Sequence, residues 1–272
     1  MKVFVIDVAR CNGCYSCQLV CKDEHVGNDW SPYAKPQPDT GHFWMKIKET
    51  EHGSVPKVKI EYRPTPCMHC DNAPCIKAAG DGAVYKRRDG LVIIDPEKAK
   101  GRKDLVASCP YGAIYWNGEL NLPQKCTGCA HLIDAGEVPR CVDACGVEAI
   151  KFGEEEELRG LIAQAEVLQP EMGLKPKVYY LNLPKFFVAG DVYDPVLDEV
   201  LEGAQVTLIN EETGRTWTET TDDFGDFWFR RLGPGSYTLK VEKNGYRPYM
   251  VQQLKVDRSL NVGSIGLERA QG

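Results

Sequence analysis

The sequence predicts an α+β fold in which two regions are stabilised in different ways. All twelve cysteines lie between positions 11 and 145, and none follows. From residue 184 onward, short segments rich in Val, Thr, Tyr, Phe and Trp alternate with turn residues, which is the pattern of an all-β domain. We therefore expect a cysteine-rich domain over 1–152 with an insertion at 22–66, a helical linker at 153–183 and an all-β domain at 184–272.

Composition and charge exclude several classes of protein. The net charge of −6 supplies no basic face for nucleic acid. No run of about 18 apolar residues is present, so we expect no direct membrane insertion. The first ten residues hold a short apolar run broken by Asp7 and no cleavage site before Cys11, unlike a secretory signal peptide. A disulfide framework is typical of secreted chains, and this sequence shows no secretory signal. We therefore expect the cysteines to bind metal in a cytoplasmic protein.

The first cysteine motif has a specific spacing. Cys11 and Cys14 are followed by Cys17 and Cys21, in the pattern C-x-x-C-x-x-C-x-x-x-C. This is the spacing of a bacterial-ferredoxin loop, in which three thiolates bind one cubane cluster and the fourth binds a different cluster. The motif therefore implies a partner motif elsewhere in the chain.

Three further cysteine groups follow this motif, and parts of them repeat. They are Cys67-x-x-Cys70-x4-Cys75, then Cys109-Pro110, then Cys126-x-x-Cys129-x11-Cys141-x3-Cys145. The segment 109–114 resembles 145–150, and both resemble 79–84, where Ala79 stands in place of a cysteine. Between the repeats, the turn signal Asp89-Gly90 before 91–94 predicts a hairpin. Twelve thiolates are enough for three four-cysteine clusters with none left over.

Four positions that would complete a fourth cluster hold other residues. They are Ala79, Ala99, Arg102 and Leu105. By the crossover of ligands between paired motifs, all four belong to one cluster site, so the loss of a single cluster explains them together. We expect Arg102 and Leu105 to fill the vacated volume, with Arg102 near a carboxylate or a remaining cluster.

The same crossover rule groups the remaining ligands. The predicted sets are Cys11, Cys14, Cys17 and Cys145 for cluster one, Cys21, Cys126, Cys129 and Cys141 for cluster two, and Cys67, Cys70, Cys75 and Cys109 for cluster three.

Other interpretations of these residues are less well supported. The two C-x-x-C pairs alone would fit zinc ribbons, but the 2-2-3 spacing of the first motif does not fit a tetrahedral zinc site. His69 and His131 lie inside cysteine loops, and we expect them beside the ligands or on the surface rather than on the metal. Lys22, Lys125 and Arg140 are expected as solvated surface residues, and the alternative is that their charges, like hydrogen bonds from the histidine N–H groups, tune the potentials of the clusters.

The segments outside the cysteine motifs also carry structural signals. The insertion at 22–66 is rich in aromatic residues and is expected to hold strands near 43–49 and 57–62 and to cover a cluster. Apolar spacing after Ile150 predicts an amphipathic helix that starts with four glutamates. In the last region seven strands are expected, at 186–192, 205–209, 216–221, 226–230, 237–242, 251–256 and 260–265.

Two resemblances follow from these residues. The segments 203–208, 221–229 and 232–239 resemble transthyretin-like modules related to carboxypeptidase regulatory domains, which implies a sandwich or barrel and a docking or structural role. Residues 1–152 resemble the electron-transfer subunits of the dimethyl-sulfoxide-reductase family of molybdenum enzymes. Such subunits resemble two fused ferredoxins, which implies a ferredoxin-like double-motif iron–sulfur domain. They usually carry four clusters, and the substitutions at Ala79, Ala99, Arg102 and Leu105 leave three [4Fe-4S] clusters here.

The family resemblance implies a partner. We expect a large catalytic subunit that holds molybdenum on bis-molybdopterin guanine dinucleotide, in a heterodimer or larger complex. Three clusters followed by a transthyretin-like domain are most similar to the transhydroxylase branch, which implies hydroxyl transfer between trihydroxybenzenes. A respiratory conduit to a membrane anchor and a protein whose clusters only hold the fold are the alternatives. No nucleophile–base pair or phosphate loop is present, so no catalytic residue is expected in this chain.

Overall fold

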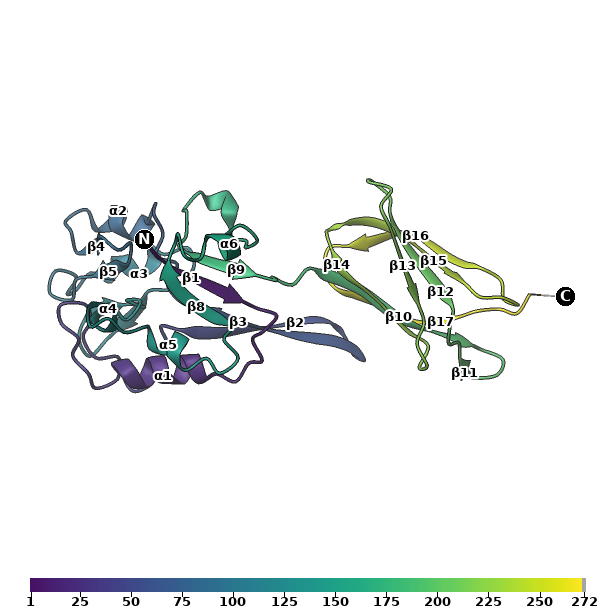
Figure 1. Ribbon diagram of the computed structural model, residues 1–272, viewed down its shortest axis with the longest axis horizontal. Coiled ribbons are helices and arrows are strands. Elements are labelled where there is room, and N and C mark those ends of the chain that lie inside the picture. Colours follow the sequence, from purple (N-terminus) through teal and green to yellow (C-terminus); the bar gives the residue numbers. More distant parts are fainter. Residues whose placement is uncertain (271–272) are drawn as a thin grey trace. The chain divides into compact units, whose positions relative to one another are not determined.

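The computed structural model describes residues 1–270 and divides into two compact units (Figure 1). Unit 1 comprises residues 1–49 and 62–183, and unit 2 comprises residues 50–61 and those from 184 onward. Both units consist mostly of strands and loops, with few and short helices. No helix within residues 1–270 is long and apolar enough to cross a membrane.

Unit 1 is organised around a three-stranded sheet. Strand β1 (Lys2–Asp7) lies in the centre, pairs antiparallel with β8 (Ile150–Glu154) and pairs parallel with β9 (Val178–Leu181). Four successive residues of β1, Val3 to Ile6, are buried, as expected of a central strand covered on both faces. The sheet therefore joins the start of the chain to two segments about 150 and 175 residues later.

The cysteine loops of unit 1 are connected by short helices and two hairpins. The helices are α1 (Ser16–His25), α2 (Pro74–Ala79), α3 (Asp104–Ala107), α4 (Ala130–Asp134), α5 (Arg140–Asp143), α6 (Arg159–Ile162) and the 3-10 turn η1 (Pro170–Met172). The hairpins are β4 (Val84–Lys86) with β5 (Val92–Ile94) and β6 (Tyr115–Asn117) with β7 (Leu122–Gln124). The first hairpin confirms the prediction made from Asp89-Gly90.

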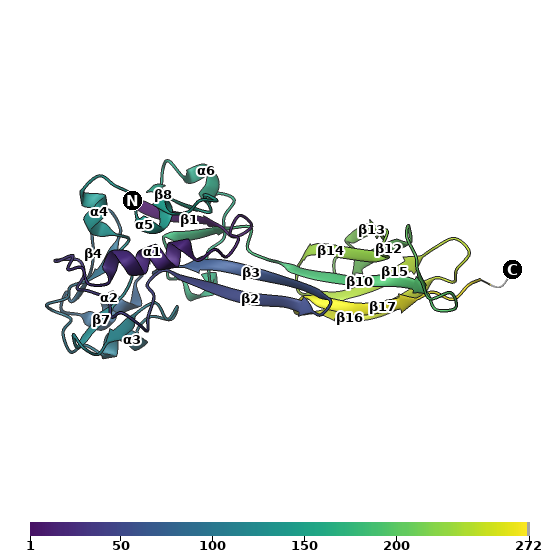
Figure 2. The ribbon, with the colours of Figure 1, turned by 90° about the horizontal axis from the view of Figure 1, so that it is seen from below.

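The predicted insertion forms a long hairpin, β2 (Lys46–Ser54) and β3 (Lys57–Thr65), seen as a two-stranded ribbon in Figure 2. Both strands lie close to the predicted ranges. The end of the hairpin, residues 50–61, belongs to unit 2. There Gly53 has φ 89°, and a Cβ at this position would lie 2.5 Å from the Phe187 ring. Lys57 is buried and forms an ion pair with Asp226. The insertion thus packs partly against the all-β region, which the sequence did not indicate.

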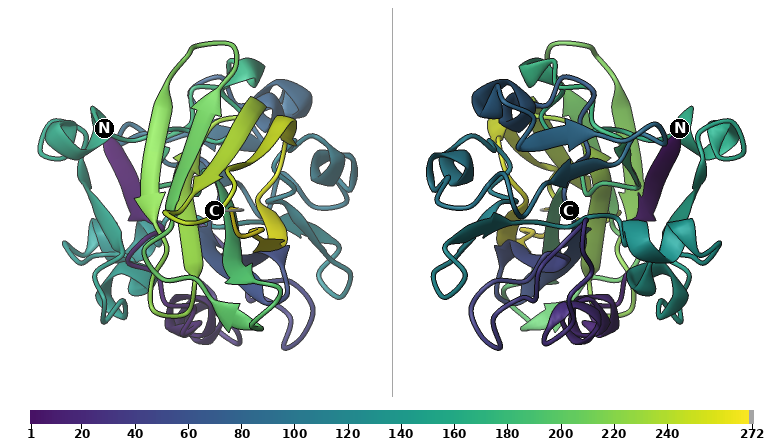
Figure 3. Two further views of the ribbon diagram at one scale, coloured as in Figure 1. Left: turned by 90° about the vertical axis from the view of Figure 1, so that its right-hand side faces the viewer. Right: turned by 90° about the vertical axis from the view of Figure 1, so that its left-hand side faces the viewer.

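Unit 2 is a sandwich of two open sheets (Figure 3). One sheet has β10 (Phe186–Asp194) between β11 (Glu199–Val200) and β14 (Asp226–Leu232), with β17 (Leu260–Gly266) also paired to β10. The other has the order β13 (Thr216–Thr220), β12 (Gln205–Asn210), β15 (Gly235–Glu242) and β16 (Tyr249–Val256). All seven predicted strands are present, and of the two predicted architectures the open sheets correspond to the sandwich.

Alternating residues of both sheets form the core of unit 2. Val188 and Val192 of β10, Val206 and Leu208 of β12, Phe227 and Phe229 of β14, and Leu239 and Val241 of β15 are all buried in one cluster. This period of two is what two packed sheets require, because successive side chains of a strand point to opposite faces.

The segment 153–183 differs from the predicted helical linker. Its helix α6 has only four residues, and Leu161 and Ile162 are half-buried rather than packed in a core. The chain then continues into β9, whose Tyr180 is fully buried and donates from its hydroxyl to the carbonyl of Pro64. These residues are therefore part of unit 1. Parallel pairing with β1 could not be read from the local pattern, because it joins residues far apart in sequence.

Candidate metal centres

All twelve cysteines have free thiols and lie in unit 1. Eight are buried, three are half-buried and Cys14 is exposed. Most lie in loops, while Cys17, Cys21, Cys75 and Cys141 lie on short helices. Free cysteine is often buried as a small apolar residue, so it is the grouping of these thiols that indicates ligands.

The first set brings together thiols from opposite ends of the cysteine region. Burial is the largest cause that raises the pKa of Cys17 to about 12, followed by the negative charges of Cys11, Cys145 and Cys14. The sheet explains how Cys145 reaches this loop. Ile6 pairs with Ile150, and the Asp7 N–H donates to the Ala149 carbonyl at 2.8 Å, so the end of β1 lies beside the start of β8.

The second set surrounds a small cavity. Burial, then Cys126 and Cys129, raises the pKa of Cys21 well above its ordinary value. Burial, then Cys129, Cys21 and Cys126, does the same for Cys141. The cavity is lined by these four sulfur-bearing residues together with Phe4, His25, Trp44, Met45 and Pro139. Trp44 is fully buried, so an aromatic residue of the insertion covers this set, as expected.

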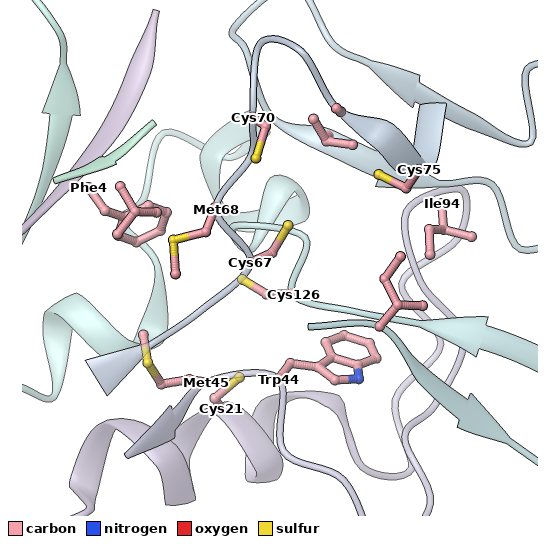
Figure 4. Packing of buried hydrophobic residues seen from close by; sticks show 14 of the residues in the cluster. Phe4, Cys21, Trp44, Met45, Cys67, Met68, Cys70, Cys75, Ile94 and Cys126 are labelled. Atoms are coloured by element: carbon pink, nitrogen blue, oxygen red, sulfur yellow. The ribbon is translucent and has the colours of Figure 1, made fainter. Parts of the chain in front are cut away.

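The third set lies on the other side of Cys126 (Figure 4). Burial raises the pKa of Cys70 to about 12, followed by the charges of Cys67, Cys109 and Cys75. In Figure 4, Cys67 lies next to Cys126, with Cys70 and Cys75 on one side and Cys21 on the other. The second and third sets are therefore neighbours.

Backbone N–H groups point at several of the sulfurs. Ala113 N donates to Cys109 Sγ at 3.4 Å, and Ala149 N donates to Cys145 Sγ at 3.2 Å. Both bonds run from the fourth residue after the cysteine, which is the structural meaning of the sequence repeat. Gly128 N likewise donates to Cys126 Sγ at 3.3 Å. Donors aimed at sulfur stabilise the thiolate form that an iron–sulfur cluster requires.

No group of three or more His, Cys, Asp or Glu side chains in the described part of the chain is arranged to hold a metal ion. A four-iron cluster takes one thiolate at each iron, so its four ligands do not have to meet around one ion. Four thiols around a shared volume, with N–H donors at their sulfurs, fit a cluster of this kind. When bound, such a cluster supplies one-electron transfer.

The four substituted positions lie together. Ala79, Ala99 and Leu105 are buried in the same core cluster. Arg102 Nη1 donates to the Ala79 carbonyl at 3.4 Å and to Asp81 at 2.9 Å. Its Nη2 donates to the Ala78 carbonyl at 3.2 Å and to Asp104 at 2.9 Å. As expected, Arg102 is placed near carboxylates, and it ties the last turn of α2 to the start of α3.

The three basic residues predicted to be solvated lie in different surroundings. Arg140 is part-exposed and pairs with Glu24 at 2.7 Å, and Lys22 donates to the Pro38 and His42 carbonyls, each at 2.8 Å. Lys125, predicted to be a solvated surface residue, is instead only 2% exposed. That prediction is wrong because the chain after β7 carries the side chain inward, where Lys125 Nζ donates to the carbonyls of Val92 and Cys126.

The histidines lie close to the ligands. His69 is buried, and its Nε2 is 3.9 Å from Cys126 Sγ. His131 Nε2 is 2.9 Å from Glu24, and its ring stacks on Trp30 with centroids 4.1 Å apart. His25 was not singled out from the sequence, yet it lines the cavity of the second set. Burial, then His131, lowers the pKa of His25 to about 4, so its ring is neutral. Its place four residues after Cys21 on α1 was the available signal.

Comparison with known proteins agrees with this organisation. Residues 58–155 match the family model described as a 4Fe-4S dicluster domain, and residues 188–266 match a carboxypeptidase regulatory-like domain. The chain is 44% identical to the pyrogallol hydroxytransferase small subunit of Pelobacter acidigallici, over 97% of this chain and 98% of that protein.

Iron–sulfur subunits of reductases are similar to about two thirds of the chain. The putative iron–sulfur subunit of a dimethyl sulfoxide reductase from Halobacterium salinarum is 32% identical, over 65% of this chain and 78% of that protein. The arsenate respiratory reductase iron–sulfur subunit of a Shewanella species is 30% identical, over 65% of this chain and 94% of that protein. The chain therefore belongs to the iron–sulfur electron-transfer subunits of the dimethyl-sulfoxide-reductase family of molybdenum enzymes, and the pyrogallol hydroxytransferase small subunit is a relative along its whole length.

Proposed function

We propose that this chain carries three [4Fe-4S] clusters and transfers electrons for a larger catalytic subunit that holds molybdenum on bis-molybdopterin guanine dinucleotide. The observation that carries the proposal is the placement of the cysteines in unit 1. Cys21, Cys126, Cys129 and Cys141 line one cavity, and Cys67, Cys70 and Cys75 lie on the other side of Cys126. The filled fourth position, with Arg102 bonded to the Ala79 carbonyl, supports three clusters rather than four.

The ligand assignment follows the same grouping. Cluster one is held by Cys11, Cys14, Cys17 and Cys145, cluster two by Cys21, Cys126, Cys129 and Cys141, and cluster three by Cys67, Cys70, Cys75 and Cys109. The exposed Cys14 leaves the first set closest to solvent, while the second set is fully buried.

For the reaction of the complex, we propose hydroxyl transfer involving pyrogallol. The support is the whole-length likeness to a pyrogallol hydroxytransferase small subunit, which extends through the C-terminal sandwich. The reductase subunits cover only about two thirds of the chain, so the alternative, a respiratory conduit, accounts for less of the protein. We also propose a cytoplasmic location, because cysteines that serve as metal ligands rather than as disulfides suit a reducing compartment.

The cluster number is tested by anaerobic purification and analysis of iron and acid-labile sulfide. Three four-iron clusters require about twelve of each per chain. A reproducible content near eight or sixteen would contradict the proposal. The matched comparison is a quadruple variant with Cys at the four substituted positions, Ala79, Ala99, Arg102 and Leu105. An iron content above that of the natural chain would show that a fourth cluster site can be rebuilt there.

The partner is tested by affinity purification of the chain from its native host under anaerobic conditions. A co-purifying large subunit with about one molybdenum per complex, and conversion of pyrogallol by that complex, is the expected result. Recovery of a membrane anchor with reductase activity instead would favour the respiratory alternative.

A further inference from the structure

Lys125 is a buried cation without a carboxylate beside it. It is 2% exposed, and within residues 1–270 it forms no ion pair with a carboxylate. Its Nζ bonds are to two backbone carbonyls, those of Val92 and Cys126. Burying an ammonium group is unfavourable unless opposite charge compensates it. The negative groups near Lys125 are the cysteine thiolates.

Those thiolates belong to two different sets. The Nζ of Lys125 donates to the carbonyl of Cys126, of the second set. Its other acceptor is the carbonyl of Val92, and the N–H of Val92 donates to His69, which lies in the cysteine loop of the third set. In agreement with this position, Lys125 opposes the effect of burial, which raises the pKa of Cys75 of the third set. Lys125 therefore lies at the boundary between the second and third sets.

His69 occupies the same boundary, and its hydrogen bonds define its tautomer. The Val92 N–H donates to His69 Nδ1 at 2.9 Å, so in the neutral ring the proton is on Nε2. That Nε2–H faces Cys126 Sγ at 3.9 Å, in the second set. The backbone N–H of His69 donates to Cys67 Sγ at 3.5 Å, in the third set. One residue thus donates to sulfurs of both sets.

The Val92 peptide holds both side chains in place. Its N–H orients the His69 ring and its carbonyl accepts from Lys125 Nζ. Val92 itself is fixed in β5, where it pairs with Lys86 of β4. Both polar groups are therefore positioned by one strand rather than by mobile loops.

We propose that Lys125 and His69 form a polar bridge that raises the reduction potentials of the second and third clusters and leaves the first unchanged. Reduction adds negative charge, which a nearby cation and N–H···S bonds stabilise, most strongly where water is excluded. The bridge would keep two adjacent clusters readily reducible. This inference depends on the proposed function, because it needs clusters at these two sets.

The test is the Lys125→Met variant of the complete, cluster-loaded protein, followed by a redox titration with electron paramagnetic resonance. Met is similar in length and apolar, so it removes the charge with little change in volume. We expect two of the three clusters to become harder to reduce, each by at least tenfold in the equilibrium constant. For a one-electron couple that is a fall of about 59 mV. The remaining cluster, that of the first set, should keep its potential.

Lys86→Met is the matched control. Lys86 Nζ also donates to a cysteine carbonyl, that of Cys70, at 3.1 Å, but it pairs with Asp71. Removing it should move the potentials much less than removing Lys125. His69→Leu should lower the potential of one cluster, that of Cys126, without reaching the first set.

Unchanged potentials in Lys125→Met with full iron content would overturn the bridge, as would an equal shift of all three clusters. If that variant does not load iron, Lys125→Gln keeps N–H donors and removes the charge, and it is judged by the same criterion. If neither loads, unchanged potentials in His69→Leu overturn the proposal. Failure of the proposed function is distinct, because the unmodified protein would then lack the three clusters.

Discussion

In unit 1 eight buried cysteines lie in the interior among apolar residues, whereas the hydrophobic core of unit 2 is formed by two packed sheets and contains no cysteine. The helices of unit 1 have four to ten residues, too short to be stable alone. The strands of unit 2 have five to nine residues in most cases and form continuous ladders. Both regions have a hydrophobic core, but that of unit 1 includes thiols whose contribution depends on what they bind, and that of unit 2 does not.

The contrast has a consequence for how each region fails. Metal binding to buried thiolates contributes directly to folding where no preformed core exists without it. Burial in a sandwich contributes through apolar area and does not depend on a cofactor. The two units should therefore respond to different perturbations.

Removal of iron should have the largest effect, and on unit 1 alone. Treatment with an oxidant and a chelator should expose residues 62–183 to rapid amide exchange, because loss of iron removes the metal–thiolate bonds that hold the cysteine loops together. Residues 186–266 should stay protected. Hydrogen–deuterium exchange with mass spectrometry on the full chain measures both. Equal loss of protection in the two units would contradict the contrast.

Replacement of a single ligand should damage one set. Cys109→Ser should remove or convert the third cluster and lower the iron content by up to about four atoms per chain. The reason is that Cys109 influences the pKa of Cys70 and Cys75, which belong to its own set. Cys14→Ser is the comparison from the first set. Electron paramagnetic resonance distinguishes the two, and loss of signals from the other sets in a folded Cys109→Ser protein would show that the grouping is wrong.

A core change in unit 2 should reduce stability without touching iron. Phe229 is fully buried in β14, and Phe229→Ala should destabilise the sandwich by about 3–5 kcal/mol. Its neighbour Arg230 is exposed, so Arg230→Ala should cost no more than about 0.5 kcal/mol. Denaturant unfolding followed by amide exchange gives both values. A fall in iron content in Phe229→Ala would show that the units are not independent in this respect.

The smallest expected effect is a loss of stability of unit 2 at low pH. Burial would raise the pKa of Asp194, but hydrogen bonds to its carboxylate outweigh this effect, so the pKa lies below its usual 3.8. The donors are Arg269 Nε at 2.8 Å from Oδ2, the N–H groups of Val196 and Leu197, and the Tyr246 hydroxyl. A lowered folded-state pKa means that the carboxylate stabilises unit 2 fully above about pH 4 and less as the pH falls further.

Asp194→Asn should therefore be less stable than the natural chain at pH 7, and the difference should narrow below about pH 4. Unfolding midpoints measured from about pH 7 to about pH 3 test this. A difference that stays constant over the whole range would mean that the charge of Asp194 is not what stabilises the turn at 195–197.

Much of unit 2 could be predicted because its signals are local. Each strand shows alternation over a few residues, and each turn carries its own Gly, Asn or Asp, as at Asn244-Gly245. The choice between sandwich and barrel was not local, since it depends on whether edge strands close on each other. The structure leaves β13 and β16 as edges.

The ligands of unit 1 were also accessible from sequence, since the spacing of cysteines in a cluster loop is a local requirement of the cluster. The surroundings were not. Lys125 and Cys126 are adjacent in sequence, yet nothing in that pair indicates that the lysine turns inward toward Val92. His25 is not part of a recognised sequence motif. Its ring is covered by Trp44, which comes from a different segment of the chain.

The sequence by itself determined the chemistry of this protein: which thiols can bind iron, which fourth position was lost and which region is all-β. Those properties depend on residue type and spacing over at most a few tens of residues. Tertiary structure alone decided what surrounds the thiols: the pairing of β1 with β8 and β9, the end of the hairpin at 50–61 within unit 2, and the cation and imidazole between two cysteine sets. The reason is physical, because burial and electrostatic environment arise from contacts between distant segments, and these contacts exist only after the chain has folded.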